Sequence, residues 1–505
     1  MVTSEKRKVS RRAVLRFSVA SAGATLLAGC GATSLPAVTA TASAPTTAPA
    51  IAPAATPTTP AAVEPTFTSV AEAPAATNTA VPVETPVAAT PVATAGKIRW
   101  SDRANLPGVK EAIERFTQEN PGMQVTFEPR EESGFLDKYM AQCVAGTAPD
   151  LMEIEGHYKF MFADKGQLLD VRPSIEKDMT KDDVDDFYPW HWPTGWLVPE
   201  TGVVLGLPWK INVGCLIYNK DIFDEVALSY PDESWDYDRY AAALLSLVKK
   251  DSSGKIERYG GYANIWYYTW MTPHVQAWGG HVVDPKDRTK CRIGEKPALD
   301  ALEWIRARLW DDQSLMGMSV AEQLGWDGPL FVHGKVGIFE TGLHAIAGDI
   351  APELASIPNP MHLGITHMPK GPAERAALGS SDGWVIYKGT KFPDATFKLM
   401  HLLTQDDYIK ASAVEKWGQI PPRKSQIKLF EDIVVKPWQE KGVDMSIFAP
   451  ALQMGYFRVQ ESFVKQQEAL KLIEDELEKI FVLGGTPVSA MVNVCEQIDA
   501  LHKTS

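Results

Sequence analysis

The chain has 505 residues, of which 45% are hydrophobic and 22% charged, and its formal net charge is −13. An acidic protein of this kind is not expected to bind nucleic acid, whose phosphates require a basic surface. Residues 97–505 have an ordinary globular composition but exceed one comfortable hydrophobic core, so the sequence predicts two lobes.

The first thirty residues have the features of an export signal. Arg11 and Arg12 precede a weakly apolar run, residues 17–27, which is too short to span a bilayer as a mature helix. A twin-arginine pair before such a run is typical of Tat-type signals. The run ends in Leu-Ala-Gly-Cys, which resembles the lipobox of bacterial lipoproteins. We therefore expect residues 1–30 to be a lipoprotein signal peptide and Cys30 to carry the lipid, with an ordinary secretory signal as the alternative.

Residues 31–96 consist almost wholly of Ala, Thr, Pro and Val. Such a segment cannot bury enough apolar surface to offset its ordering entropy, and its prolines favour an extended polyproline II conformation. The sequence therefore predicts a disordered tether that holds the folded part away from a membrane surface.

The folded part opens with a strand, a helix and a second strand. Residues 97–100 alternate polar and apolar side chains, residues 109–116 carry apolar side chains at helical spacing, and residues 123–127 alternate again. A strand–helix–strand unit predicts a parallel sheet and an α/β fold. Later segments repeat this mixture, with helices predicted over 298–310 and 469–481 and strands over 335–342 and 383–389.

The cysteines that follow the lipobox are far apart. They are Cys143, Cys215, Cys291 and Cys495. They form no Cys-x-x-Cys pair, so the sequence predicts no metal site, and nothing in it indicates a cofactor. One or two disulfides are compatible with an exported protein, and buried free thiols are the alternative.

Sequence signals of catalysis are absent. There is no HExxH or Walker-type motif and no GxGxxG after a strand. The nearest carboxylate pair, Glu153 and Glu155, comes with no other catalytic signal. The sequence therefore predicts a protein that is not an enzyme.

Seven phrases, in order along residues 97–505, resemble the family 1 extracellular solute-binding proteins of ABC importers, whose relatives bind maltose and other sugars. The phrases are AIERFTQENPGMQVTFE, YMAQCVAGTAPDLMEIEGHYKFMFADKGQLLDV, GLPWKINVGCLIYNKDIF, ESWDYDRYAAALLSL, GKVGIFETG, GSSDGWVIYKGTKFPDATFKLMHLL and IPPRKS. Any one of them is weak, and their shared order carries the resemblance. A lipobox and a low-complexity tether are also common in this family.

The resemblance implies a type II binding-protein clamp, in which two α/β lobes are joined by crossing strands and close on a ligand. It assigns residues 97–211 and 338–381 to an N-terminal lobe and 212–337 and 382–505 to a C-terminal lobe. It places crossings near residues 211–219, 337–342 and 381–386. The implied protein is a monomer that is exported and lipid-anchored to the cell membrane, faces the extracellular or periplasmic side, and delivers a mono- or oligosaccharide to an ABC permease.

A sugar site needs aromatic rings for the apolar C–H faces of the ligand and polar groups for its hydroxyls. In the aromatic-rich stretch GYANIWYYTWM, residues 261–271, Trp266, Tyr268 and Trp270 alternate and would share one face of an extended segment. We predict that this face is a stacking wall, with packing into the core as the alternative. A second stretch, YPWHWPTGW at 188–196, could lengthen the cleft or pack on itself.

The resemblance implies further ligand-binding residues by their motif positions. They are Asp102, Arg103, Glu155, His157, Tyr158, Trp209, Lys210, Asn212, Glu340, His344, Asp382 and Trp384. Glu155 could instead be a solvated carboxylate, and His157 and His344 could be plain surface histidines. Trp384 stands where many sugar-binding members have Gly-Gly-Trp, and the Ser-Ser-Asp-Gly-Trp phrase found here keeps the ring but leaves the role of the loop backbone open.

Other ligands and roles remain as alternatives. The same clamp could hold a polyamine, which needs a carboxylate cluster beside aromatic rings, or a sugar phosphate, which needs Arg, Lys or glycine-rich amides. Arg103 and Lys210 weigh against a cationic ligand if they face the cleft. A surface sensor or adhesin that docks to a signalling partner is an alternative of a different class.

Overall fold

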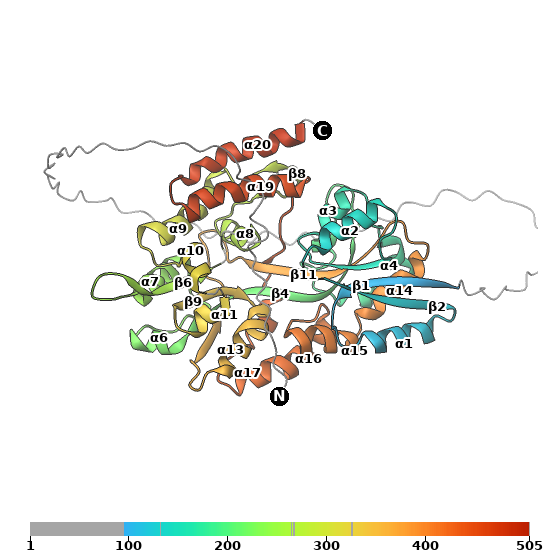
Figure 1. The fold of residues 1–505 in the computed structure, drawn as a ribbon, viewed down its shortest axis with the longest axis horizontal. Coiled ribbons are helices and arrows are strands. Elements are labelled where there is room, and N and C mark those ends of the chain that lie inside the picture. The colour runs from blue at the N-terminus through green and yellow to red at the C-terminus, as the bar shows by residue number, and fades with distance from the viewer. Residues whose placement is uncertain (1–94, 132, 264, 266–267, 325–326, 504–505) are drawn as a thin grey trace, which may run out of the picture. The chain divides into compact units, whose positions relative to one another are not determined.

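Figure 1 shows the computed structural model, which describes residues 95–503 except 132, 264, 266–267 and 325–326. The predicted signal peptide, Cys30 and the predicted tether lie outside the described residues, as does Trp266. None of the described helices has the length and apolar character needed to cross a membrane.

Most of the described strands belong to one mixed sheet. Its order is β2-β1-β3-β11-β4-β9-β6-β5, with β10 paired to β4 and β12 paired to β11. These strands are β1 Gly96–Arg103, β2 Met123–Arg130, β3 Leu151–Ile154, β4 Gly206–Asn219, β5 Lys249–Lys250, β6 Ile256–Ala263, β9 Val336–Gly342, β10 Leu363–Thr366, β11 Ala377–Ile386 and β12 Phe457–Arg458. A separate hairpin consists of β7 Val283–Asp284 and β8 Asp287–Cys291.

Helices cover the sheet. Those before β9 are α1 Val109–Glu119, α2 Phe135–Val144, α3 Lys159–Asp164, α4 Arg172–Asp178, α5 Lys181–Asp185, α6 Lys220–Glu225, α7 Tyr237–Leu247, α8 Tyr268–Ala277, α9 Lys296–Arg306, α10 Met318–Leu324 and α11 Asp327–Val332. Those after it are α12 Leu343–Ala345, α13 Ala351–Ser356, α14 Pro393–Leu403, α15 Asp406–Ile409, α16 Ile427–Phe430, α17 Lys436–Gln439, α18 Phe448–Ala451, α19 Gln466–Leu477 and α20 Met491–Lys503. Short 3-10 turns occupy Thr194–Trp196, Lys424–Gln426 and Val488–Ala490, and π-helical turns occupy Ala307–Asp311, Ile346–Ile350, Lys410–Glu415, Glu431–Val435 and Glu478–Val482.

β4 joins the two halves of the sheet. Its residues 206–213 pair antiparallel with β11, and its residues 214–218 pair antiparallel with β9. β11 continues the sheet to β3 and β1, whereas β9 continues it to β6. We call the side with β1, β2 and β3 the first lobe and the side with β6 and β9 the second lobe; β4 and β11 run between them (Figure 1). This arrangement confirms the predicted α/β class and its two lobes.

β11 is the second crossing strand. Its residues 377–378 pair with β12, and its residues 383–386 pair with β3 of the first lobe. The crossing predicted near residues 337–342 is wrong, because β9 pairs along its length with β4 and β6 and so stays in the second lobe. A short buried strand has the same sequence pattern whether it crosses between the lobes or stays within one of them. The assignment of residues 338–381 to the N-terminal lobe differs from this arrangement for the same reason, since β9 and β10 both pair with the second-lobe part of β4. The other lobe boundaries assigned from the sequence stay a prediction.

The opening of the folded part matches the sequence pattern. β1 and β2 are parallel neighbours joined by α1, with Gly96 opposite Met123 and Arg103 opposite Arg130. Phe116 of α1 and the β1 residues Ile98 and Trp100 are fully buried. The predicted strand–helix–strand unit is therefore confirmed.

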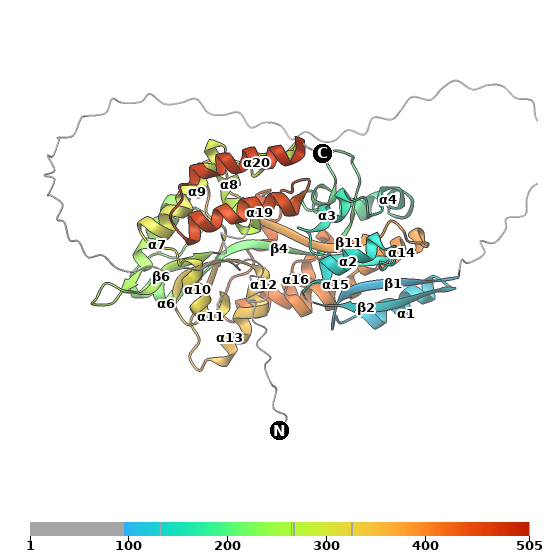
Figure 2. The same ribbon diagram turned by 45° about the horizontal axis from the view of Figure 1, so that its top comes forward.

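The cysteines adopt both of the states left open by the sequence. Cys291 of β8 is disulfide-bonded to Cys495 of α20, while Cys143 and Cys215 are buried free thiols. α20 lies beside α19 over the second lobe in two views (Figures 1 and 2). The disulfide thus fastens the terminal helix to the β7–β8 hairpin.

The tryptophan-rich stretch at residues 188–196 packs into the protein. Trp192 and Trp196 are buried, and their indole N–H groups donate to the Gly206 carbonyl (2.9 Å) and to Ser381 Oγ (2.8 Å). Trp190 is half-buried and donates to the Leu452 carbonyl (3.1 Å). These contacts favour self-packing over the alternative of a longer cleft.

Candidate ligand-binding site

Charged side chains meet where the crossing strands pass between the lobes. Asp382 of β11 lies opposite Lys210 of β4 in the sheet register, and Lys210 Nζ is 2.9 Å from its Oδ2. Arg103, at the end of β1, places Nη2 3.5 Å from the same oxygen, and the Gly156 N–H donates to Oδ1 (3.3 Å). Burial alone would raise the pKa of Asp382, but Lys210 and Arg103 hold it well below its usual range.

Arg103 connects this carboxylate to two others on the edge of the first lobe. Its guanidinium lies 3.0 Å from Glu155 and 3.3 Å from Glu153. Arg130 of β2 also contacts Glu153, with Nη2 2.8 Å from Oε2. Cations and carboxylates therefore alternate through the cluster. We call these residues the charged network: Arg103, Arg130, Glu153, Glu155, Lys210 and Asp382.

Asp102 and two tryptophans lie beneath the charged network. Asp102 is fully buried and accepts hydrogen bonds from the indoles of Trp384 (2.7 Å) and Trp100 (3.2 Å). Burial, with the negative charge of Glu153, raises its pKa to about 7 despite the Trp384 hydrogen bond. Trp209 and Trp384 are buried too, with ring centroids 6.1 Å apart. In this structure both rings are buried beneath the charged network, and neither exposes a ring face to solvent.

The loop after β3 forms one wall of the site. His157 and Tyr158 are half-buried with ring centroids 3.8 Å apart, and His157 Nε2 is 3.6 Å from Glu155 Oε2. Burial lowers the pKa of His157 to about 4, so its imidazole is neutral at pH 7. Burial and Asp382 raise the pKa of Glu155, which Arg103 opposes. The wall thus presents a neutral imidazole, a phenol and a carboxylate that is paired with Arg103.

A second group of predicted residues comes from the second lobe and the crossing. Asn212 of β4 and His344 of α12 are hydrogen-bonded through their side chains (3.2 Å), and the His344 N–H donates to Asn212 Oδ1 (3.3 Å). The half-buried Trp270 ring has its centroid 6.1 Å from that of His344. His344 keeps exposed surface, yet desolvation by surrounding protein, with Lys210 nearby, lowers its pKa to about 4. Its ring therefore keeps contact with solvent while it lies beside Asn212, Trp270 and Lys210.

The structure corrects the interpretation of residues 261–271. Tyr268 and Trp270 lie in the helix α8, not in an extended segment. Helix residues are about 100° apart around the axis, so two residues two positions apart point in nearly opposite directions and do not form one face. The error arose because the alternation of large aromatic residues favoured an extended segment; Pro273, which removes a helical hydrogen bond, lies inside the helix that forms. The Tyr268 side chain lies outside the described part of the structure.

Glu340 is not part of either group in this structure. It is buried in the second lobe, where its Oε1 is 2.9 Å from His274 Nε2, and His274 Nδ1 is 2.8 Å from the Tyr237 hydroxyl. This chain of hydrogen bonds joins β9, α8 and α7. The sequence placed Glu340 correctly on a strand, but the direction of its side chain depends on the sheet neighbours of β9.

Sequence analysis missed several residues that the structure brings to the site. Trp417 is half-buried, and its ring centroid lies 5.8 Å from the Arg103 guanidinium and 5.2 Å from Lys210 Nζ, within cation–π range. Arg130 and Glu153 complete the charged network from β2 and β3. The sequence feature that could have pointed to Trp417 is its position just before the IPPRKS phrase. Local spacing does not indicate any of these three, because only the fold brings them together.

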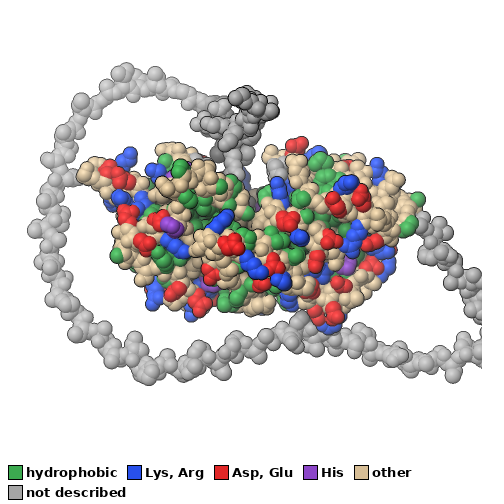
Figure 3. Space-filling model, turned by 90° about the horizontal axis from the view of Figure 1, so that it is seen from below, with side chains coloured by type: hydrophobic (Ala, Val, Ile, Leu, Met, Phe, Trp, Pro, Cys, Tyr) green, Lys and Arg blue, Asp and Glu red, His purple; other side chains and the backbone are tan. Residues whose placement is uncertain are grey.

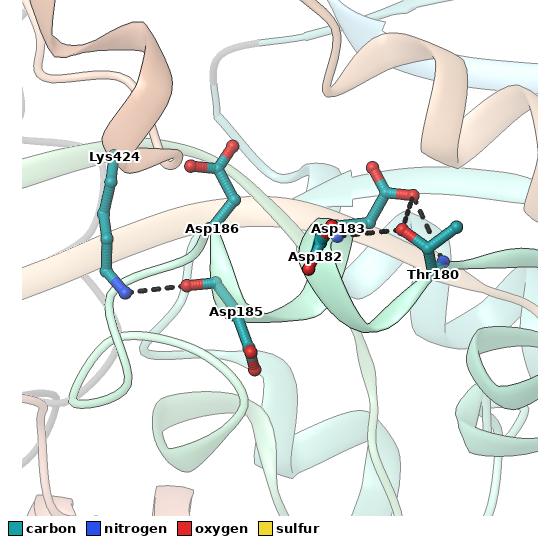
Figure 4. Close-up of a pocket in the computed structure, with 6 residues that line it drawn as sticks. All are labelled: Thr180, Asp182, Asp183, Asp185, Asp186 and Lys424. Carbon is teal, nitrogen blue, oxygen red and sulfur yellow. Dashed lines mark hydrogen bonds between the residues drawn. The ribbon is translucent and has the colours of Figure 1, made fainter.

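A surface pocket elsewhere in the first lobe is acidic. It is lined by Thr180, Asp182, Asp183, Asp185, Asp186 and Lys424 (Figure 4). Thr180 caps α5 by accepting from the Asp183 N–H (3.1 Å), and Lys424 donates to the Asp185 carbonyl (2.7 Å). The pocket shares no residue with the predicted site. Within the described residues, no group of three or more His, Cys, Asp and Glu side chains is arranged to hold a metal ion.

Charged side chains of both signs are mixed on one face of the molecule (Figure 3). On the face drawn in Figure 3, acidic and basic side chains are interspersed, without a broad basic area.

Residues 100–410 match the model of the bacterial extracellular solute-binding protein family. The chain belongs to this family. It is therefore a solute-binding protein of the kind that serves ABC import, and not an enzyme. The family resemblance seen in the sequence is confirmed.

Similar proteins cover nearly the whole folded part. A putative binding protein of Brucella abortus (strain 2308) is 22% identical over 406 residues, 79% of this chain and 90% of that protein. An ABC substrate-binding protein from Listeria monocytogenes, solved in complex with cycloalternan, has a TM-score of 0.65 at 19% identity and covers 81% of this chain and 99% of its own. The sugar-binding protein MalE from Xanthomonas citri also has a TM-score of 0.65, at 16% identity, with coverage of 80% and 97%. The likeness to these structures confirms the predicted type II two-lobe fold.

Proposed function

We propose that this solute-binding protein captures an uncharged carbohydrate, a mono- or oligosaccharide, at the charged network and delivers it to an ABC permease. The observation that carries the proposal is the pairing of charges there. Lys210 and Arg103 both contact Asp382, and Arg103 also contacts Glu155. Such a site offers strong hydrogen-bond donors and acceptors side by side, which suits hydroxyl groups that do both.

The same pairing weighs against charged ligands. A polyamine would need carboxylates whose negative charge is not already balanced by a cation of the protein. A sugar phosphate would need Arg or Lys side chains whose positive charge is not already balanced by a carboxylate. His157 and His344 are neutral at pH 7 and so can donate and accept as well. Trp270 and Trp417, both half-buried, are the rings best placed to lie against the apolar face of a sugar. Trp209 and Trp384 would hold Asp102 and the network in place.

The ligands of similar proteins support this class of ligand. The Listeria protein is in complex with cycloalternan, and a cyclo/maltodextrin-binding protein, with a TM-score of 0.62 at 20% identity, is complexed with maltotetraose. Both ligands are uncharged oligosaccharides with many hydroxyl groups.

We propose the cell-surface arrangement from the sequence. Residues 1–30 would direct Tat-type export, Cys30 would carry the lipid anchor, and residues 31–96 would let a monomeric binding domain reach the permease. Radiolabelled palmitate incorporated by the chain, and lost in Cys30→Ala, would support the anchor. An unlabelled but exported chain would contradict it.

Calorimetric titration tests the ligand. We expect saturable binding of one sugar from a panel of maltose, maltotetraose and cycloalternan. Trp417→Ala and Asp382→Asn should each bind this sugar at least tenfold more weakly than the parent, a loss of about 1.4 kcal/mol in binding free energy. Asp185→Asn, in the acidic surface pocket, is the matched control and should bind as the parent does. Binding of spermidine or glycerol phosphate in place of the sugars, or silence across the panel, would contradict the proposal.

A further inference from the structure

A buried arginine joins the two lobes at a place that shares no residue with the candidate site. Arg288 of β8 contacts Asp164, the last residue of α3, through two parallel hydrogen bonds, Nη1 to Oδ1 and Nη2 to Oδ2, each 2.9 Å long. Arg288 is 6% exposed. Bidentate arginine–carboxylate pairs are among the strongest hydrogen-bonded contacts between side chains. We call Arg288 and Asp164 the interlobe ion pair.

The rest of the guanidinium is fixed as well. Its Nε donates to the Ser462 carbonyl (3.0 Å) and Nη2 donates to the Phe463 carbonyl (3.2 Å). Its central carbon lies 4.4 Å from the centroid of the Phe160 ring of α3. A second carboxylate, Glu200, is 3.6 Å from Nη1. The arginine therefore has little freedom to turn away from α3.

The two partners belong to different lobes. α3 follows β3 directly, and the segment after it is hydrogen-bonded to the end of β11, with the Leu169 N–H donating to the Ile386 carbonyl (2.9 Å). β8 is fastened to α20 by the Cys291–Cys495 disulfide. In Figure 1, α3 lies with α2 on the first-lobe side, and β8 lies near α19 and α20 on the other.

α3 also leads directly into the candidate site. Lys159, its first residue, donates from Nζ to the Gly156 carbonyl (2.6 Å), within the loop that carries Glu155 and His157. A force on α3 is thus transmitted to the wall of the site. The contact that holds α3 to β8 acts on the separation of the lobes and on the site loop together.

We propose that the interlobe ion pair limits how far the two lobes separate, and that Arg288 is thereby a positioning residue for the site loop. When one partner is removed from a buried pair, the other keeps a desolvated, unbalanced charge, and conformations that return this charge to water are favoured. The loss of the pair should therefore shift the protein toward more separated lobes. The proposal does not depend on the identity of the ligand.

Distances between the lobes in the ligand-free full chain test the proposal. Spin labels on p-acetylphenylalanine at Lys138 of α2 and Lys296 of α9, both exposed, report one distance distribution by double electron–electron resonance. We expect Arg288→Met and Asp164→Asn each to shift it to longer distances, and the double variant to shift it no further than Arg288→Met alone. Because these labels react with the introduced p-acetylphenylalanine and not with thiols, the native cysteines stay unmodified.

The matched control is Arg292→Met. Arg292 forms an ion pair with Asp284 inside the β7–β8 hairpin, so its loss should leave the distribution unchanged. If Arg288→Met fails to fold, Asp164→Asn, which preserves the size of the side chain, carries the test. An unchanged distribution in a folded variant, or a shift as large in Arg292→Met, would overturn the proposal.

Discussion

Asp382 shows how a single side chain can organise a site. It lies on a crossing strand, opposite Lys210 in register, and within reach of Arg103 from the first lobe. Its depressed pKa means that it stays charged throughout the physiological range. Together with Glu153 and Glu155 it balances the three cations of the charged network before any ligand arrives, so the ligand need not supply charge.

The buried histidine of the site should make stability depend on pH. The pKa of His157 falls from its usual 6.5 to about 4 on folding, so between these values the unfolded chain binds a proton that the folded protein does not. Stability should then decrease as the pH falls from 6.5 to 4, and His157→Gln should reduce this decrease. Urea unfolding at intervals across this range measures it. Equal slopes in parent and variant would contradict the prediction.

At the scale of elements, the β7–β8 hairpin and α20 depend on their disulfide. Cys291 and Cys495 are 204 residues apart in sequence, so the bond restricts a long loop of the unfolded chain. Cys291→Ser should lower the free energy of unfolding by about 2–4 kcal/mol. Denaturant unfolding, with and without dithiothreitol, checks this. The reductant should bring the parent to the stability of the variant and leave the variant unchanged, and a drop in both would indicate another cause.

Elements also show where local sequence stops being informative. The pattern at residues 97–127 predicted β1, α1 and β2 because alternation and helical spacing report directly on a half-buried strand and an amphipathic helix. At 261–271 large aromatic side chains fit a strand or a helix equally well, and their alternation favoured an extended segment over the helix that forms. For residues 335–342 the strand itself was predicted, but its neighbours in the sheet were not.

At the scale of the whole molecule, the candidate site is assembled from segments far apart in sequence. Resemblance to the family identified Arg103, Lys210 and Asp382, which the fold indeed brings into contact. It did not identify Trp417 or Arg130, since their proximity to the network arises from packing between elements. Nor could it predict that Trp384 is fully buried, because burial depends on which strands flank β11.

β4 has one more consequence for the molecule. Its residues 206–213 complete the sheet of the first lobe and its residues 214–218 complete that of the second, in one unbroken strand. If either lobe unfolded alone, half of this strand would lose its ladder partners, and buried backbone groups of the other lobe would be exposed. Unfolding should therefore be cooperative across both lobes. We expect a calorimetric scan to show one heat-absorption peak, whose van't Hoff enthalpy equals its calorimetric enthalpy.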